Sequence, residues 1–165
     1  MNHLAHTQKN TTNGFTLVEL MVTVAVLVVL MSIGIPSFQT IFGQNRAAAS
    51  ANEILASLQF ARSEAVRLGT AVQLCPSTDA ATCTGGSDWT GGWIVHIDNE
   101  VRRIGPALHS SVSASGADSL TYGSAGQIEG ARAPFALSVA TGAGIHRCIL
   151  VDASGRAQID RGECV

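Results

Sequence analysis

The sequence predicts an α+β protein in which a long N-terminal helix packs on a C-terminal antiparallel β-sheet or small sandwich. An apolar run near the N-terminus, a stripe of apolar residues at helical spacing and a series of short alternating runs carry this prediction. The 165 residues are 46% apolar and 13% charged, which excludes a disordered chain. With a formal net charge of −2, the chain as a whole has no positive field to attract nucleic acid or anionic lipid.

The first element is an apolar run from Leu17 to Ile35 whose only charged residue is Glu19. As a helix it would span roughly 28 Å, close to the ~30 Å hydrocarbon core of a membrane. The preceding segment contains Lys9 and no acidic residue, but no A-x-A-like site follows the apolar run, as it would in a secretory signal. A simple membrane anchor fits this composition without explaining Glu19, because a carboxylate in a membrane helix is costly and marks a functional site.

A cleavage after Gly14 would explain the carboxylate. The new amino terminus, on Phe15, would lie one helical turn before Glu19 on the same face. Glu19 could then pair with that amine or with the amine of a neighbouring copy, and the second pairing would set the register of a helical assembly. The residues Gly14-Phe15-Thr16-Leu17-Val18-Glu19, followed by the apolar run and Pro36, resemble the type III signal of type IV pilins and type II secretion pseudopilins.

This resemblance implies that a prepilin peptidase cuts between Gly14 and Phe15 and that Phe15 is then N-methylated. It assigns Glu19 to filament assembly and Pro36 to a helix kink, which a proline causes by removing a backbone hydrogen bond. It also implies a division into four segments: a leader peptide (1–14), a transmembrane and assembly helix (15–36), an amphipathic helix of the head (37–69) and a β-rich periplasmic head domain (70–165).

Behind Pro36 the helix is predicted to continue to Leu68. Ile54, Leu58, Ala61 and Ala65 follow one another at spacings of four and three, which predicts an apolar stripe that a sheet should cover. Gly69 is the expected C-cap.

Beyond the helix, alternating apolar runs separated by Gly, Ser, Asp and Asn predict an antiparallel arrangement. Trp89 and Trp93 flank a glycine turn and are expected to close one end of a small core. The Ser- and Gly-rich segment 110–119 is expected to be an exposed loop. The predicted strands are 71–75, 93–97, 101–104, 120–122, 135–139, 148–151 and 157–159.

Three motifs narrow the family further: LQFARSEAV at 58–66, VQLC at 72–75 and W-x-x-G-W-I-V-x-x-D at 89–98. Together they resemble the GspH/FimT group, which contains the pseudopilin GspH and the minor pilins FimT and FimU. The resemblance implies a minor pilin of a type IV pilus, at or near the tip, that supports pilus assembly, twitching motility, adhesion or DNA uptake. The alternative is a GspH-type minor pseudopilin of a type II secretion system.

The same resemblance implies partners and a location. The expected partners are other major and minor pilins, the prepilin peptidase and an inner-membrane assembly platform. The protein would cross the inner membrane once, with a periplasmic head, before it joins a cell-surface pilus.

Four cysteines allow three connectivities. An exported domain enters an oxidising compartment, in which such thiols pair. We expect the two short-range pairs, Cys75–Cys83 and Cys148–Cys164. No C-x₂-C pattern is present and no histidine falls at ligand spacing, so no metal site is expected.

A possible DNA contact follows from one further resemblance. FimT-like proteins of some transformable bacteria are associated with DNA binding through a C-terminal Gly-Arg-x-Arg pattern, and this chain has Gly-Arg-Ala-Gln at 155–158. Arg156 matches the first arginine, and Arg147 and Arg161 flank it. Arginines of this kind could bind phosphates, although Asp152 and other acidic residues nearby would oppose a polyanion.

No catalytic motif is evident in the sequence. Nothing resembles a nucleophile elbow, a phosphate-binding glycine loop or an HExxH helix. We therefore expect a structural and interaction protein without catalysis or a cofactor.

Overall fold

The computed structural model describes residues 14–130, 135–142 and 144–164, apart from the side chains of residues 33–37. In these residues one long helix, α1 (Leu17–Leu68), precedes nine strands. Internal contacts divide the chain into two units, Met1–Phe38 and Gln39–Val165. The second unit is called the head below.

Helix α1 ends where the sequence predicts. The N–H of Gly69 donates to the carbonyl of Ala65 at 2.9 Å and closes the last turn. Arg67, in that last turn, pairs with Glu64 at 2.7 Å. This ion pair raises the pKa of Arg67 and lowers that of Glu64, chiefly through the hydrogen bond between the two side chains.

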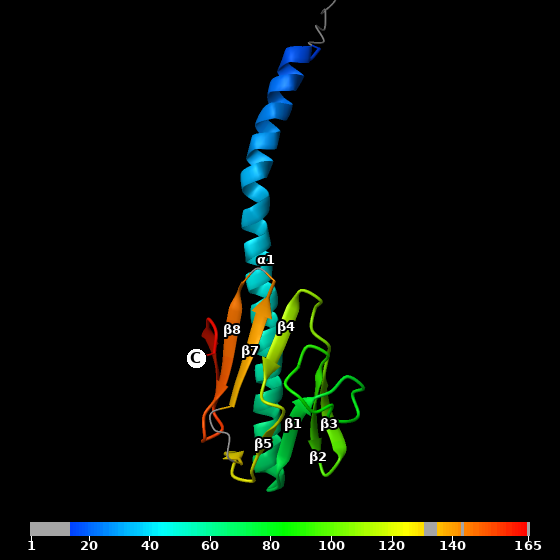
Figure 1. Cartoon of the computed structure of the whole chain (residues 1–165), viewed down its shortest axis with the longest axis vertical. Coiled ribbons are helices and arrows are strands. Elements are labelled where there is room, and N and C mark those ends of the chain that lie inside the picture. Colours follow the sequence, from blue (N-terminus) through cyan, green and yellow to red (C-terminus); the bar gives the residue numbers. More distant parts are fainter. Residues whose placement is uncertain (1–13, 131–134, 143, 165) are drawn as a thin grey trace, which may run out of the picture. The chain divides into compact units, whose positions relative to one another are not determined.

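The strands form two antiparallel sheets that lie side by side over the second half of α1 (Figure 1). The five-stranded sheet has the order β3-β2-β1-β5-β6, and the four-stranded sheet has the order β4-β7-β8-β9. The bounds are β1 (Val72–Pro76), β2 (Trp93–Ile97), β3 (Glu100–Gly105), β4 (Val112–Gly116), β5 (Leu120–Tyr122), β6 (Ile128–Glu129), β7 (Phe135–Thr141), β8 (His146–Val151) and β9 (Ala157–Arg161).

The core lies between the helix and both sheets. Ile54, Leu58, Ala61 and Ala65 are completely buried, which confirms the predicted stripe. They belong to one apolar cluster with residues of β1, β2, β4, β5, β7 and β8. One face of α1 therefore covers both sheets, and the fold is the predicted α+β arrangement.

Two tryptophans lie in the core, where the sequence predicted them. Trp89 and Trp93 are completely buried, and Trp89 meets Phe135 edge to face, with the ring centroids 6.0 Å apart. The ring of Trp93 lies over Gly105, its cross-strand partner on β3. A Cβ atom on Gly105 would come within 1.9 Å of Cε2 of Trp93, so this position accepts no larger residue unless the ring moves.

The loop predicted at 110–119 is wrong in its central part, because Val112–Gly116 form β4 and pair with β7. Val112 and Ala114 are buried, whereas Ser113 and Ser115 are exposed. This alternation is that of a half-buried strand, but the serine content, which is typical of loops, conceals it. The sequence analysis also missed the short strand β6.

Replacing Gly105 by alanine should destabilise the head by about 1–3 kcal/mol, because the added methyl group overpacks against Trp93. Unfolding of the purified protein by urea measures this change. Gly142→Ala is the matched control, since a Cβ atom there meets nothing within 4 Å. Equal unfolding midpoints for the two variants would contradict the packing described for Trp93.

Candidate functional site

The expected processing junction and assembly carboxylate lie at the start of α1. Gly14, Phe15 and Thr16 precede the helix, and Phe15 is 77% exposed. The hydroxyl oxygen of Thr16 accepts a hydrogen bond from the N–H of Glu19 at 3.2 Å, so Thr16 is the N-cap of the helix. The sequence analysis missed this role, although the T-x-x-E spacing is that of a capping box. An acidic side chain in the first turn also suits the positive end of the helix dipole.

The first half of α1 presents an uncovered apolar surface. The large apolar side chains from Leu17 to Met31 are each at least half exposed, and Glu19 is exposed among them. An apolar surface of this size marks a site of membrane or protein contact.

Within the described part of the chain, no helix meets the length and apolarity needed to cross a membrane. The transmembrane helix expected at 15–36 therefore stays a prediction, as does the kink expected at Pro36, whose side chain lies outside the described residues. The leader expected at 1–14 also lies outside them, except for Gly14.

The structure joins Cys75 to Cys83 and Cys148 to Cys164, the two pairs expected from the sequence. The first disulfide closes a polar loop organised by Asp79. The N–H and hydroxyl of Thr82, the N–H of Ala81 and the hydroxyl of Ser77 donate to the Asp79 carboxylate, and they hold its pKa well below the usual value. The second disulfide ties the segment after β9 to β8.

One group of side chains has the composition of a metal site. The ligand atoms of Cys75, Cys83 and His96 lie within 4.8 Å of one another, and Nε2 of His96 is 3.4 Å from Sγ of Cys83. A metal ion binds cysteine as the thiolate. Because the two sulfur atoms are bonded to each other, this group does not offer a metal site in the disulfide form.

The three arginines expected to contact DNA do not form one cluster. Arg147 on β8 and Arg161 on β9 are cross-strand partners, whereas Arg156 precedes β9 at the other end of the hairpin. At ~3.3 Å per residue of strand, Arg156 and Arg161 are about 16 Å apart. Nε of Arg156 also lies 3.7 Å from a carboxylate oxygen of Asp152. Like charges directly opposite each other on neighbouring strands repel. An anion bound beside Arg147 and Arg161 would relieve the repulsion between these two arginines.

The turn that precedes Arg156 is held against the helix by Arg62. Nε of Arg62 donates to the carbonyl of Gly126 at 3.0 Å, and Nη2 donates to the carbonyl of Ser154 at 2.9 Å. A Cβ atom on Gly155 would lie 2.0 Å from the carbonyl oxygen of Gly126, and the φ angle of Gly155 is +80°. The glycine of the Gly-Arg pattern therefore has a packing role, and the sequence analysis missed Arg62.

The same turn carries a stabilised carboxylate. The hydroxyl of Ser154 and the N–H of Arg156 donate to Asp152, and they lower its pKa from the usual carboxyl value. The negative charge of Asp152 therefore persists in mildly acidic solution and faces Arg156, which weakens the attraction of this turn for a polyanion.

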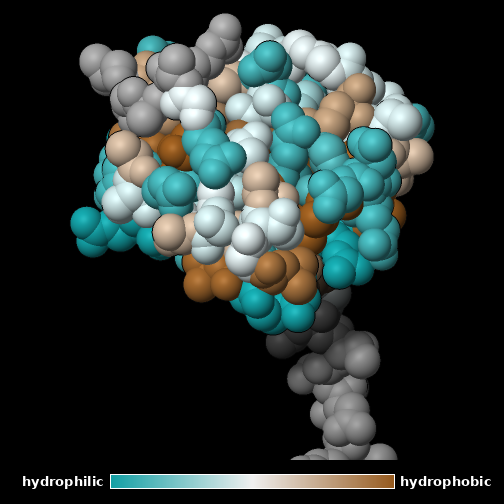
Figure 2. Space-filling view, turned by 90° about the horizontal axis from the view of Figure 1, so that it is seen from below, coloured by the Kyte–Doolittle hydropathy of each residue, from teal (hydrophilic) through white to brown (hydrophobic). Residues whose placement is uncertain are grey.

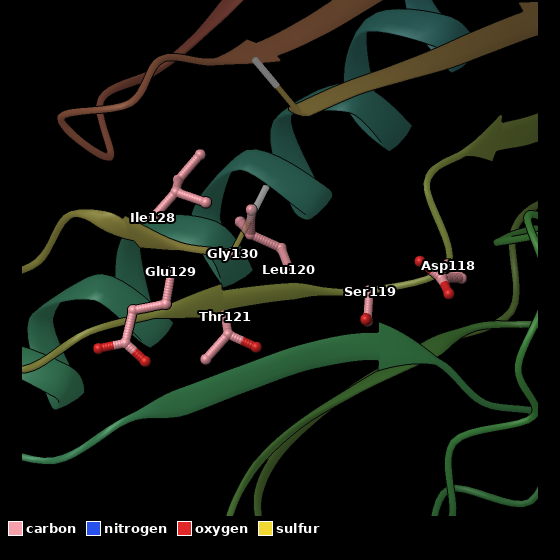
Figure 3. Close-up of a pocket in the computed structure, with 7 residues that line it drawn as sticks. All are labelled: Asp118, Ser119, Leu120, Thr121, Ile128, Glu129 and Gly130. Atoms are coloured by element: carbon pink, nitrogen blue, oxygen red, sulfur yellow. The ribbon is translucent and has the colours of Figure 1, made fainter. Parts of the chain in front are cut away.

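A hollow of about 270 Å³ lies beside β5 and β6. Figure 3 shows the side chains of Thr121 and Glu129 on one side of these strands and those of Leu120 and Ile128 on the other. The carboxylate of Glu129 makes this hollow unsuitable for an anion. On the face of the molecule seen in Figure 2, hydrophilic side chains predominate and apolar ones form small separate patches.

The sequence matches two family models. The first, described as type II transport protein GspH, covers residues 50–155, more than half of the chain. The chain belongs to the GspH family. The second model, the prokaryotic N-terminal methylation motif, covers residues 9–35 and so includes Gly14, Phe15 and Glu19. This GspH-family protein is thus a minor pilin or pseudopilin of the type IV pilus and type II secretion class, as the sequence predicted.

Two solved structures share the fold of this GspH-family protein. The type IV minor pilin FimU of Pseudomonas aeruginosa strain PAO1 is 21% identical, with a TM-score of 0.57, and the match covers 70% of this chain and 89% of that one. The minor pseudopilin EpsH from the type 2 secretion system of Vibrio cholerae is 15% identical, with a TM-score of 0.52, over 72% of this chain and 99% of that one. These similarities show the pilin-like fold alone. A search of curated proteins finds no match.

Replacing Arg62 by methionine should destabilise the head by roughly 2 kcal/mol or more, because two backbone carbonyls are deprived of hydrogen bonds from a charged donor. The unfolding midpoint of the purified protein reports the change. Arg67→Met is the control, since its partner Glu64 is on the same helix and such pairs contribute little. If Arg67→Met were the more damaging change, Arg62 would not be the link between helix and turns.

Proposed function

We propose that this GspH-family protein is a minor pilin of a type IV pilus, a structural and initiation subunit at or near the pilus tip. In this role it supports pilus assembly, twitching motility, adhesion or DNA uptake. The observation that carries the proposal is the exposed carboxylate of Glu19 in the first turn of an uncovered apolar helix. Such a helix needs lipid or other helices around it, and a carboxylate in either environment needs a cationic partner.

The chemistry of the N-terminus supplies that partner. Cleavage by the prepilin peptidase after Gly14 would free the amine of Phe15, which is N-methylated in a second step and stays positively charged. Segment 15–36 would hold the protein in the inner membrane, with the head in the periplasm, until the assembly platform transfers it to the filament. There Glu19 pairs with the amine of a neighbouring pilin. The chain itself performs no catalysis in this scheme and needs no cofactor.

The second candidate is a minor pseudopilin of a type II secretion system. The family model carries the GspH description, and the match to EpsH covers nearly all of that structure. Both candidates use the same N-terminal chemistry and differ in the filament that the protein joins. Co-purification from cross-linked membranes separates them, because pilus subunits would accompany a minor pilin and secretion-system pseudopilins would accompany a pseudopilin.

Replacing Glu19 by valine should leave cleavage and folding intact but strongly reduce incorporation into filaments. The neighbouring amine then has no charge partner, while the N–H that Thr16 caps is retained. Immunoblotting of sheared filaments and of membranes measures the two pools. Glu19→Asp is the matched control, since it keeps the charge on a shorter side chain and should keep part of the incorporation.

The processing junction has its own variant. Gly14→Val should leave the leader attached, and mass spectrometry of the intact protein would show the uncleaved mass. Normal cleavage of Gly14→Val, or an unmodified N-terminus at a residue other than Phe15, would contradict the assigned junction.

Filaments that contain Glu19→Val at the wild-type level would contradict the assembly role.

We also propose a DNA contact at the cross-strand pair Arg147 and Arg161. Binding of duplex DNA to the purified protein, measured over a range of salt concentrations, should weaken in the double variant Arg147→Gln, Arg161→Gln. Its salt dependence should flatten by about one unit of slope for each DNA phosphate that the variant no longer neutralises. Arg156→Gln is the control, because Arg156 is already paired with Asp152. An unchanged slope in the double variant would remove this proposal.

A further inference from the structure

The first disulfide lies beside a histidine on the face of the five-stranded sheet that points away from the core. Leu74 on β1 belongs to the core cluster, so the next residue, Cys75, points to the other face. His96 on β2 pairs with Gln73, two residues before Cys75, and therefore shares that face. Of the three ligand residues, Cys75 is buried, His96 is half-buried and Cys83 is exposed.

The spacing of these side chains suits a tetrahedral ion. With zinc bonds of about 2.3 Å to sulfur and about 2.0 Å to nitrogen, a tetrahedral site separates its sulfur and nitrogen ligands by about 3.5 Å. Nε2 of His96 lies 3.4 Å from Sγ of Cys83. The Cα atoms of Cys75 and Cys83 are 5.6 Å apart, which leaves both sulfur atoms within reach of one ion once the bond between them is broken.

A hollow beside the group has room for the remaining ligand of such an ion. Its volume is about 360 Å³, and its lining includes Cys83, His96, Gln73 and Asn99. Three protein ligands leave the fourth position of a tetrahedral zinc ion open to water. A water molecule in this hollow would occupy that position next to two residues whose side chains end in amides.

The second disulfide lacks this arrangement. His146 precedes Cys148 by two residues on β8, but Nε2 of His146 lies 3.5 Å from a carboxylate oxygen of Glu163. Among residues 14–130, 135–142 and 144–164, the ligand atoms of three histidine, cysteine or acidic side chains come within 4.8 Å of one another at the first disulfide alone. The two cysteine pairs are therefore not equivalent toward a metal ion.

We propose that the dithiol form of the head binds one Zn²⁺ ion through the sulfur atoms of Cys75 and Cys83 and Nε2 of His96, with water as the fourth ligand. Disulfides form in oxidising compartments and are rare in the cytosol, so an exported chain carries thiols before it carries the disulfide. The inference goes beyond the proposed function and concerns the head alone, so it applies to a pilus and to a secretion filament alike.

The ion and the disulfide exclude each other. Binding converts the two thiols to thiolates and releases their two protons to solvent, and no electron is transferred. A disulfide oxidant later takes two electrons from the thiolates and two protons from solvent. Its own disulfide becomes two thiols, the bond between Cys75 and Cys83 forms, and Zn²⁺ is released. Until then the ion holds the ends of the polar loop together, as the disulfide does afterwards.

Cobalt absorption tests the proposal in the cleaved, full-length protein in detergent micelles. The protein is reduced with a phosphine in the absence of oxygen, so that no competing thiol is added, and is titrated with Co²⁺. One equivalent should give the intense visible bands of a tetrahedral ion with thiolate ligands, and one equivalent of Zn²⁺ should abolish them. The oxidised protein should give no such bands, because its sulfur atoms are bonded to each other.

His96→Asn and His146→Asn are a matched pair, since each histidine lies near one pair of cysteines. His96→Asn should weaken Zn²⁺ binding by the reduced protein roughly a hundredfold, because even the outer partners of a metal ligand contribute about 10–100-fold. His146→Asn should bind Zn²⁺ as the wild-type protein does. While oxidised, His96→Asn should melt at the wild-type temperature, which shows that the substitution leaves the fold intact.

The cysteines give a second matched pair. Cys83→Ser should abolish the cobalt bands, whereas Cys164→Ser should keep them, since it removes the more exposed sulfur of the other pair. Equal weakening by His96→Asn and His146→Asn would overturn the proposal, because the thiols would then bind the ion without the folded arrangement. Bands that are absent from the reduced protein, bands that require Cys164, or equal bands in the oxidised protein would overturn it as well.

Discussion

Two antiparallel sheets share one helix as their common cover, and the rest of the head depends on this contact. The sheets are edge to edge, so neither can bury its inner face against the other as in a sandwich. The stripe from Ala51 to Ala65 fills that need for both at once. Alanine occupies several of its positions, and β4 contributes Val112 and Ala114 to the same core.

The two halves of α1 carry apolar residues for different purposes. In the second half the apolar stripe is narrow and buried, whereas in the first half apolar residues surround the helix and are exposed. A helix that is apolar on all sides suits lipid or a bundle of similar helices. Glu19 is the exception in that half, and its place in the first turn, beside the Thr16 cap, puts its charge next to the expected amine of Phe15.

At the end of the head that holds the last turns of α1, hydrogen bonds to backbone carbonyls add to the apolar contacts of the core. Arg62 reaches from the helix to the carbonyls of Gly126 and Ser154, and so joins one turn of each sheet. The same packing explains Gly155, whereas the register of β8 and β9 separates Arg156 from Arg147 and Arg161. The Gly-Arg pair at 155–156 is therefore compatible with a structural role, and the hairpin divides its arginines between two ends.

Much of this protein is determined by local sequence. The apolar run, the Gly14–Phe15 junction, Glu19, the buried stripe, most strands and the two short-range disulfides follow from spacing and from family resemblance, because each depends on residues close together in the chain. Strand β4, the reach of Arg62 and the place of His96 beside the first disulfide depend on partners in other segments of the chain. Only the tertiary structure decides these features. A serine-rich segment becomes a strand when a neighbouring strand supplies its hydrogen bonds, and an arginine links a helix to distant turns when the fold places backbone carbonyls beside it.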